Sequence, residues 1–250
     1  MPPRYDLDKI RFSVDQQTLE RAFKIYDSQG ILCFEDFDLG YRASVRGSGG
    51  NVYHVYVSAK NFDQGTCDCY LGQENVLCKH MVAVALRAVS AGKKIGEEEL
   101  SQPQVGCSDR VGSLSAEELA ETRGRITAAI KFIKSYNGPS RIWFAYQNSL
   151  TEGCARLTEI VSSLPVSPQT AGLLVDLLLR LDKKLRQGGV DDSDGTVGGF
   201  MTEVASMLVE FAEMDNGCIK TFEKIAGRQT CFEWDETLVR ISDEGMDWLG

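Results

Sequence analysis

The chain has 250 residues, of which 43% are hydrophobic and 25% are charged, and it contains only 6 prolines. This composition is typical of an ordinary folded protein of one or two domains and excludes a disordered, collagen-like or low-complexity chain. The formal net charge of −9 disfavours a histone-like protein, a protein coat for DNA and a polybasic membrane anchor.

The N-terminal residues and the hydropathy pattern bear on the compartment. The start, MPPRYDLDKIRF, has Asp6 and Asp8 where a signal peptide needs an unbroken apolar stretch. No segment approaches the roughly 18 apolar residues of a membrane span. We therefore expect a cytoplasmic protein without a membrane partner. In such a reducing compartment, clustered cysteines are more often metal ligands than disulfide bridges.

The first hundred residues predict a helix, a small antiparallel sheet and a second helix. Apolar residues at helical spacing mark 15–28, and strands follow over 31–37 and 41–46. A glycine-rich turn then leads into a third strand over 52–59, as in a β-hairpin. Residues 78–91 predict a helix that is apolar around most of its circumference.

Four metal-ligand candidates follow the third strand, in the pattern Cys67-x-Cys69-x8-Cys78-x-His80. Three thiolates and one imidazole are a donor set of structural zinc sites, where four protein ligands complete the tetrahedron. One pair leaves the sheet and the other opens the helix, so we expect one structural Zn²⁺ to join the two. A redox dithiol is the alternative, but cysteines separated by one residue form a strained disulfide and lack the C-x-x-C arrangement.

This ligand pattern, preceded by strand, glycine turn and strand and continued by an apolar helix, resembles the SWIM zinc finger over about residues 20–92. The resemblance implies a zinc-dependent module that binds DNA or protein partners. Such modules are found in chromatin-remodelling-type ATPases, Mutator-like transposases and many small prokaryotic proteins. The helices that follow, with DDSDG at 191–195, are similar to the C-terminal part of the small prokaryotic type. No ATPase or transposase domain accompanies the finger in this sequence.

The rest of the chain predicts a linker and an acidic helical domain. Residues 93–113 are polar and lack periodicity, which is typical of a linker. From 114 to 250 the periodicity is helical, and residues 101–250 carry 22 Asp and Glu against 15 Lys and Arg. Helices joined by short loops predict antiparallel hairpins stacked as a bundle or as an α-solenoid of helical repeats, although no fixed repeat period is present. The predicted helices lie at about 115–136, 139–162, 167–187, 196–214, 216–226 and 234–243.

The fold class predicted is therefore α+β. A zinc-stapled module with the N-terminal helix occupies 1–92, the linker 93–113 and the all-helical domain 114–250. Within that domain the segment Asp191–Gly195 suggests a calcium loop. Aligning its glycine with the invariant loop glycine places Val190 and Met201 at two ligand positions, so the calcium interpretation fails. We expect an acidic N-terminal cap on the next helix instead.

The sequence gives no sign of catalysis. If His80 binds zinc, His54 is the one histidine left for acid–base chemistry, and no nucleophile or carboxylate is evident beside it. A phosphate-binding loop, an H-E-x-x-H motif and the zinc-deaminase pattern are all missing. We therefore expect no enzymatic activity and no small-molecule substrate.

Cationic and aromatic side chains of the finger module form a candidate nucleic-acid surface. Such a surface contacts phosphates and stacks on bases, although a solvated sheet face carries the same residue types. The apolar helix over 78–91 argues against the reading of base edges, which requires polar side chains. The candidates on the outward strand face are Arg42, Arg46, His54 and Tyr56, and those near the zinc knuckle (residues 66–80) are Lys60, Lys79, Arg87, Lys93 and Lys94.

These patterns favour a zinc-binding, non-enzymatic adaptor. The finger is expected to be its structural and recognition module, and the helical domain its surface for a protein partner. The alternative is a DNA-binding accessory factor of replication, repair or transposon-like systems. We expect weak, sequence-independent binding of nucleic acid at most, because the acidic half of the chain repels a polyanion.

Overall fold

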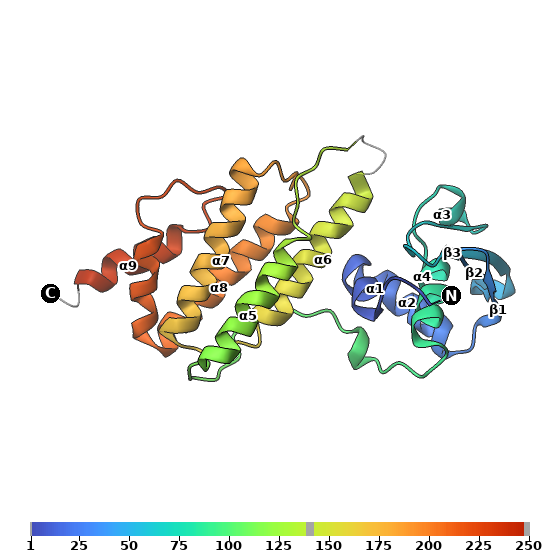
Figure 1. Cartoon of the computed structure of the whole chain (residues 1–250), viewed down its shortest axis with the longest axis horizontal. Coiled ribbons are helices and arrows are strands. Elements are labelled where there is room, and N and C mark those ends of the chain that lie inside the picture. Colours follow the sequence, from blue (N-terminus) through green and yellow to red (C-terminus); the bar gives the residue numbers. More distant parts are fainter. Residues whose placement is uncertain (1, 139–142, 248–250) are drawn as a thin grey trace. The chain divides into compact units, whose positions relative to one another are not determined.

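The structure is a computed structural model in which residues 2–138 and 143–247 are described. The chain divides into two compact units, residues 1–102 and 103–250, each with its own hydrophobic core (Figure 1). Within the described ranges, no helix combines the length and the apolar character that crossing a bilayer requires.

The first unit joins a four-stranded sheet to four helices. Neighbouring strands pair antiparallel in the order β1-β2-β3-β4. The strands are β1 (Ile31–Phe37), β2 (Gly40–Arg46), β3 (Val52–Ser58) and β4 (Gly65–Cys67). The helices are α1 (Leu7–Ser13), α2 (Gln16–Asp27), α3 (Tyr70–Gln73) and α4 (Lys79–Ser90), with single 3-10 turns η1 (Ser48–Gly50) and η2 (Glu98–Leu100).

The two faces of the sheet have different environments. Along β2, Tyr41, Ala43 and Val45 are buried, whereas Arg42 and Arg46 are exposed, as the alternation in the sequence predicts. The buried face packs on α4, which also contacts α2. Eight of the twelve residues of α4 are buried, so the helix belongs to the core as predicted. The outward face of the sheet is therefore the broad surface that the finger module offers to solvent.

The second unit is helical, and its buried residues form one continuous core. α5 packs on α6 and α7, α6 on α8, and α7 on α8, so the helices share this core in a bundle (Figure 1). The predicted helix over 216–226 is a 3-10 helix. The elements are α5 (Ala116–Ile130), α6 (Trp143–Val161), α7 (Pro168–Gln187), α8 (Thr196–Met214), η4 (Asn216–Lys224) and α9 (Glu236–Asp247).

The acidic segment before α8 caps that helix. The two carboxylate oxygens of Asp192 accept hydrogen bonds from the backbone N–H groups of Val197 and Gly198, each at 2.8 Å. Asp194 accepts a third from the N–H of Thr196 at 3.2 Å. The Asp191–Gly195 segment thus stabilises the start of α8, as expected from an acidic N-terminal cap.

Most of the predicted linker packs on one unit or the other. Ile95 and Leu100 are buried in the first core, and the Gln102 side-chain amide donates to the carbonyl oxygens of Arg11 and Val14 at 2.9 and 2.7 Å. Ser108 in turn donates to the carbonyl oxygen of Leu164 at 2.6 Å in the second unit. Two apolar residues without periodicity give no local signal in the sequence. In the structure they and the Gln102 side chain hold the segment over 93–102 against the first unit.

Candidate metal centre

Three short elements position the four ligand candidates. Cys67 ends β4, Cys69 is the N-cap of α3 and accepts a hydrogen bond from the N–H of Gly72, and Cys78 is the N-cap of α4. His80 lies in the first turn of α4. The turn through α3 is tight, because a Cβ on Gly72 would lie 2.2 Å from the carbonyl oxygen of Cys67. The spacing in the sequence thus becomes a ring of side chains at the junction of sheet and helix.

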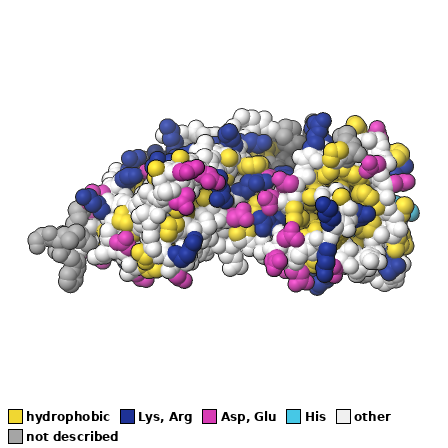
Figure 2. All heavy atoms as spheres, turned by 60° about the horizontal axis from the view of Figure 1, so that its bottom comes forward, with side chains coloured by type: hydrophobic (Ala, Val, Ile, Leu, Met, Phe, Trp, Pro, Cys, Tyr) yellow, Lys and Arg dark blue, Asp and Glu magenta, His cyan; other side chains and the backbone are white. Residues whose placement is uncertain are grey.

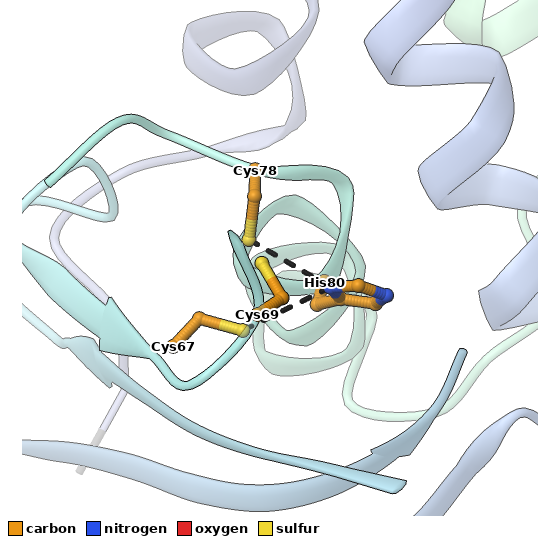
Figure 3. A group of neighbouring side chains, drawn as sticks. All are labelled: Cys67, Cys69, Cys78 and His80. Carbon is orange, nitrogen blue, oxygen red and sulfur yellow. Dashed lines mark hydrogen bonds between the residues drawn. The ribbon is translucent and has the colours of Figure 1, made fainter. Parts of the chain in front are cut away.

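The ligand atoms converge at one point (Figure 3). The three sulfur atoms and a ring nitrogen of His80 all lie within 4.8 Å of one another, and all four residues are buried. Nδ1 of His80 is 3.8 Å from Sγ of Cys67 and 3.9 Å from Sγ of Cys78. A tetrahedral zinc with the usual bond lengths requires S···N separations of about 3.6 Å and S···S separations of about 3.8 Å. The cluster is therefore compatible with one structural zinc ion.

The electrostatics of the cluster suit a cation. A hydrogen bond between the two thiol groups lowers the pKa of Cys78 and raises that of Cys67, and the His80 ring lowers the pKa of Cys78 further. The lowered pKa favours the thiolate form of Cys78, which is the form that binds zinc. A buried anion needs a compensating charge, which a metal bound by three cysteines and one histidine supplies.

The sheet supports the histidine directly. The ring of Tyr53 on β3 packs on the ring of His80, with centroids 4.5 Å apart and an interplanar angle of 37°. Nε2 of His80 is buried and has no hydrogen-bond partner among the described residues. The ring is therefore oriented by the metal-facing Nδ1 and by packing on Tyr53.

Three of the nucleic-acid candidates lie together on the outward sheet face. Arg42, His54 and Tyr56 line a shallow groove of about 470 Å³. Tyr56 pairs directly with Arg42 across β2 and β3, and the Arg42 guanidinium lies 3.2 Å from the ring centroid of Phe37. Glu35, opposite Arg42 on β1, is the carboxylate among the residues lining this groove.

The remaining candidates do not join that groove. Arg46 and Lys79 line a separate hollow together with Arg21 and Lys24 of α2, two cations that the sequence patterns did not single out. Arg21 and Lys24 are three residues apart, and this spacing would have placed both cations on one face of the helix. The Arg87 guanidinium lies 5.1 Å from the Phe34 ring. The candidates that line neither the groove nor this hollow are Lys60, Arg87, Lys93 and Lys94.

A comparison with known families identifies the centre. Residues 53–88 match the family model of the SWIM zinc finger. The matched stretch contains most of β3, all of β4 and α3, most of α4 and all four ligands. Searches among curated proteins and among solved structures found no match to the chain. The resemblance seen in the sequence is thus confirmed for the zinc module.

Proposed function

We propose that this protein, whose residues 53–88 form a SWIM zinc finger, is a non-enzymatic adaptor. Zinc fixes the finger, the finger contacts a protein partner, and the helical unit provides a second protein-binding surface. We assign it to the cytoplasm, because all eight cysteines are unpaired and a reducing compartment keeps them so. The proposal includes no catalytic step and no small-molecule substrate.

The observation that carries the proposal is the apolar tip of the zinc knuckle. Between the two ligand pairs, Tyr70 is 79% exposed, Leu71 45% and Val76 48%. Exposed apolar side chains on a metal-fixed loop favour contact with another protein, because burying them releases water while the rigid loop loses little entropy. The core position of α4 supports the same role, since a helix with eight buried residues has few side chains left for a DNA groove.

Affinity capture with a knuckle variant tests this proposal. We expect the full-length zinc-loaded protein to retain a protein partner after nuclease treatment and at high salt, because apolar contacts release no counterions. The triple variant Tyr70→Ser, Leu71→Ser, Val76→Ser should reduce the captured partner by more than about tenfold while one zinc per chain is retained.

A matched control replaces three other exposed apolar residues of the same unit, Leu32, Leu39 and Val52, with serine. This control should capture the partner as the wild type does. A partner that is lost on nuclease treatment, or that binds the knuckle variant normally, contradicts the adaptor function through the knuckle.

A DNA-binding accessory role in replication, repair or transposon-like systems is the second candidate. The groove lined by Arg42, His54 and Tyr56 favours it, because a cation beside aromatic rings suits a phosphate and a stacked base. Salt dependence separates the two roles: phosphate-driven binding weakens steeply as salt rises.

A further inference from the structure

A second hollow of the finger unit has an unusual lining. It has a volume of about 360 Å³ and lies between α2, the end of β2 and the start of α4. Its cationic side chains are Arg21, Lys24, Arg46 and Lys79, and no carboxylate is among the lining residues. Three of these four cations lie outside the stretch that matches the zinc-finger family.

This concentration of charge contrasts with the rest of the unit. Residues 1–100 carry 12 Lys and Arg against 14 Asp and Glu, and cationic and acidic side chains are interspersed on the face drawn in Figure 2. In the described part of the chain, the side chains of Arg21, Lys24 and Arg46 form no ion pair or hydrogen bond. Gathering like charges costs free energy, which a bound anion offsets.

Backbone hydrogen bonds bring together the elements that carry these cations. The N–H of Arg46 donates to the carbonyl oxygen of Gly30 at 2.7 Å, and the N–H of Gly30 donates to that of Ile25 at 2.8 Å. The end of β2 is thereby tied to the last turn of α2. A Cβ on Gly30 would lie 2.9 Å from the Ile25 oxygen, so only glycine allows this close approach. The hollow therefore lies where two elements distant in the sequence are joined by backbone hydrogen bonds.

The hollow and the groove on the sheet are separate, but β2 contributes a cation to each of them. Arg42 and Arg46 are four residues apart on the outward face of β2, which places their Cα atoms about 13 Å apart along the strand. Arg42 lines the groove and Arg46 lines the hollow. Cations therefore follow β2 from one to the other, with the rings of His54 and Tyr56 beside them on β3. A line of cations beside aromatic rings is the arrangement by which proteins hold single-stranded nucleic acid.

We propose that the hollow binds a backbone phosphate of single-stranded nucleic acid whose chain follows β2, so that Arg42 contacts a further phosphate and bases stack over Tyr56. This inference goes beyond the adaptor function, and the one knuckle residue that it involves is Lys79, which lies apart from the exposed apolar side chains of the tip. It gives the finger two separate surfaces, an apolar tip for protein and a cationic side for nucleic acid.

The test is fluorescence anisotropy with the full-length zinc-loaded protein and a labelled oligothymidylate of about 12 nucleotides, measured over a series of salt concentrations. The double variant Arg21→Ala, Lys24→Ala should weaken binding about tenfold at low salt. It should also reduce the slope of log K against log salt by about 0.7 for each phosphate that the protein no longer neutralises. The control Lys131→Ala, Lys183→Ala removes the same charge from the helical unit and should bind as the wild type does.

Two further variants separate the parts of the site. Tyr56→Leu should weaken binding without changing the salt slope, since stacking releases no counterions. Glu35→Gln should strengthen binding, because it removes the carboxylate beside Arg42, and a gain cannot arise from misfolding. Zinc content and circular dichroism check that each variant is folded.

Three outcomes would overturn the proposal. The first is that the wild type fails to bind the oligonucleotide at low salt. The second is that the double variant of the hollow and the double variant of the helical unit weaken binding equally. The third is that inorganic phosphate and a phosphorylated peptide bind the hollow but the oligonucleotide does not. The knuckle triple variant should bind the oligonucleotide normally, so failure of this inference and failure of the adaptor function remain distinguishable.

Discussion

At the scale of single residues, Gly47, in the turn between β2 and β3, links that hairpin to the metal centre. A Cβ at this position would lie 2.2 Å from Cε2 of Tyr53 and 3.4 Å from Nε2 of His80. Tyr53 is the residue whose ring packs on the zinc-ligand histidine. The lack of a side chain at residue 47 therefore allows the tyrosine to hold the ligand ring in place, although residue 47 itself contacts no metal.

We predict that Gly47→Ala destabilises the finger by about 1–3 kcal/mol, because the added methyl group overpacks the site and displaces Tyr53. Zinc should be lost at a lower concentration of a competing chelator than from the wild type. The control is Gly96→Ala, where a Cβ would meet nothing closer than 3.4 Å and those atoms belong to flexible glutamate side chains. Unchanged zinc affinity in Gly47→Ala would contradict the proposed packing role.

At the scale of elements, helix starts are fixed by specific side chains. Cys78 occupies the N-cap of α4, a position where Ser, Thr, Asp or Asn is usual, and its sulfur belongs to the metal cluster. α5 has a capping box instead: Ser115 Oγ accepts from the N–H of Glu118 at 3.3 Å, and the Glu118 carboxylate accepts from the N–H of Ser115 at 2.8 Å. One helix is thus anchored by zinc ligation and the other by ordinary capping.

We predict that Ser115→Ala destabilises the helical unit by about 1 kcal/mol, measured by urea unfolding. Hydrogen bonds from Ser115 lower the pKa of the Glu118 carboxyl. The contribution of the Glu118 carboxylate to the stability of the helical unit is therefore present above the usual carboxyl pKa. It is lost as the pH falls through the lowered pKa of Glu118. The difference between wild type and variant should shrink over that acid range. Ser206→Ala, in the middle of α8, is the control and should change stability by less than about 0.5 kcal/mol.

At the scale of the whole molecule, the two units have separate cores. The zinc ligands belong entirely to the core of residues 1–102, and the buried residues of the second unit form a cluster of their own. The metal therefore directly stabilises the sheet and a helix of the first unit. It can stabilise the helical unit only through coupling between the first and second units.

We predict that chelation of zinc, or the substitution Cys69→Ser, unfolds the region around 60–92 and leaves the helices from α5 onward folded. Hydrogen exchange measures this directly: amides of β4 and α4 should lose protection, whereas those of α7 and α8 keep it. One zinc per chain should be found in the untreated protein. Finger amides that stay protected in a metal-free preparation, or loss of protection in α7, would contradict the prediction.

The sequence alone determined the features that depend on local spacing. The zinc ligands lie within fourteen residues of one another, so their pattern identified the metal site before any packing was known. The alternation along β2 and the apolar character of α4 likewise identified their buried faces. The cap before α8 followed from acidic residues beside a helix start, because capping is an interaction between near neighbours.

Only the tertiary structure decided which distant residues meet. The three residues of β4 are too few to show a strand period, and the strand forms because β3 offers it an edge. Arg21 and Lys24 are ordinary helix-surface cations in the sequence. They become part of a cationic hollow only because backbone hydrogen bonds place β2 beside the end of α2. Periodicity shows which side of an element is apolar, but the convergence of side chains from separate elements is set by how those elements pack.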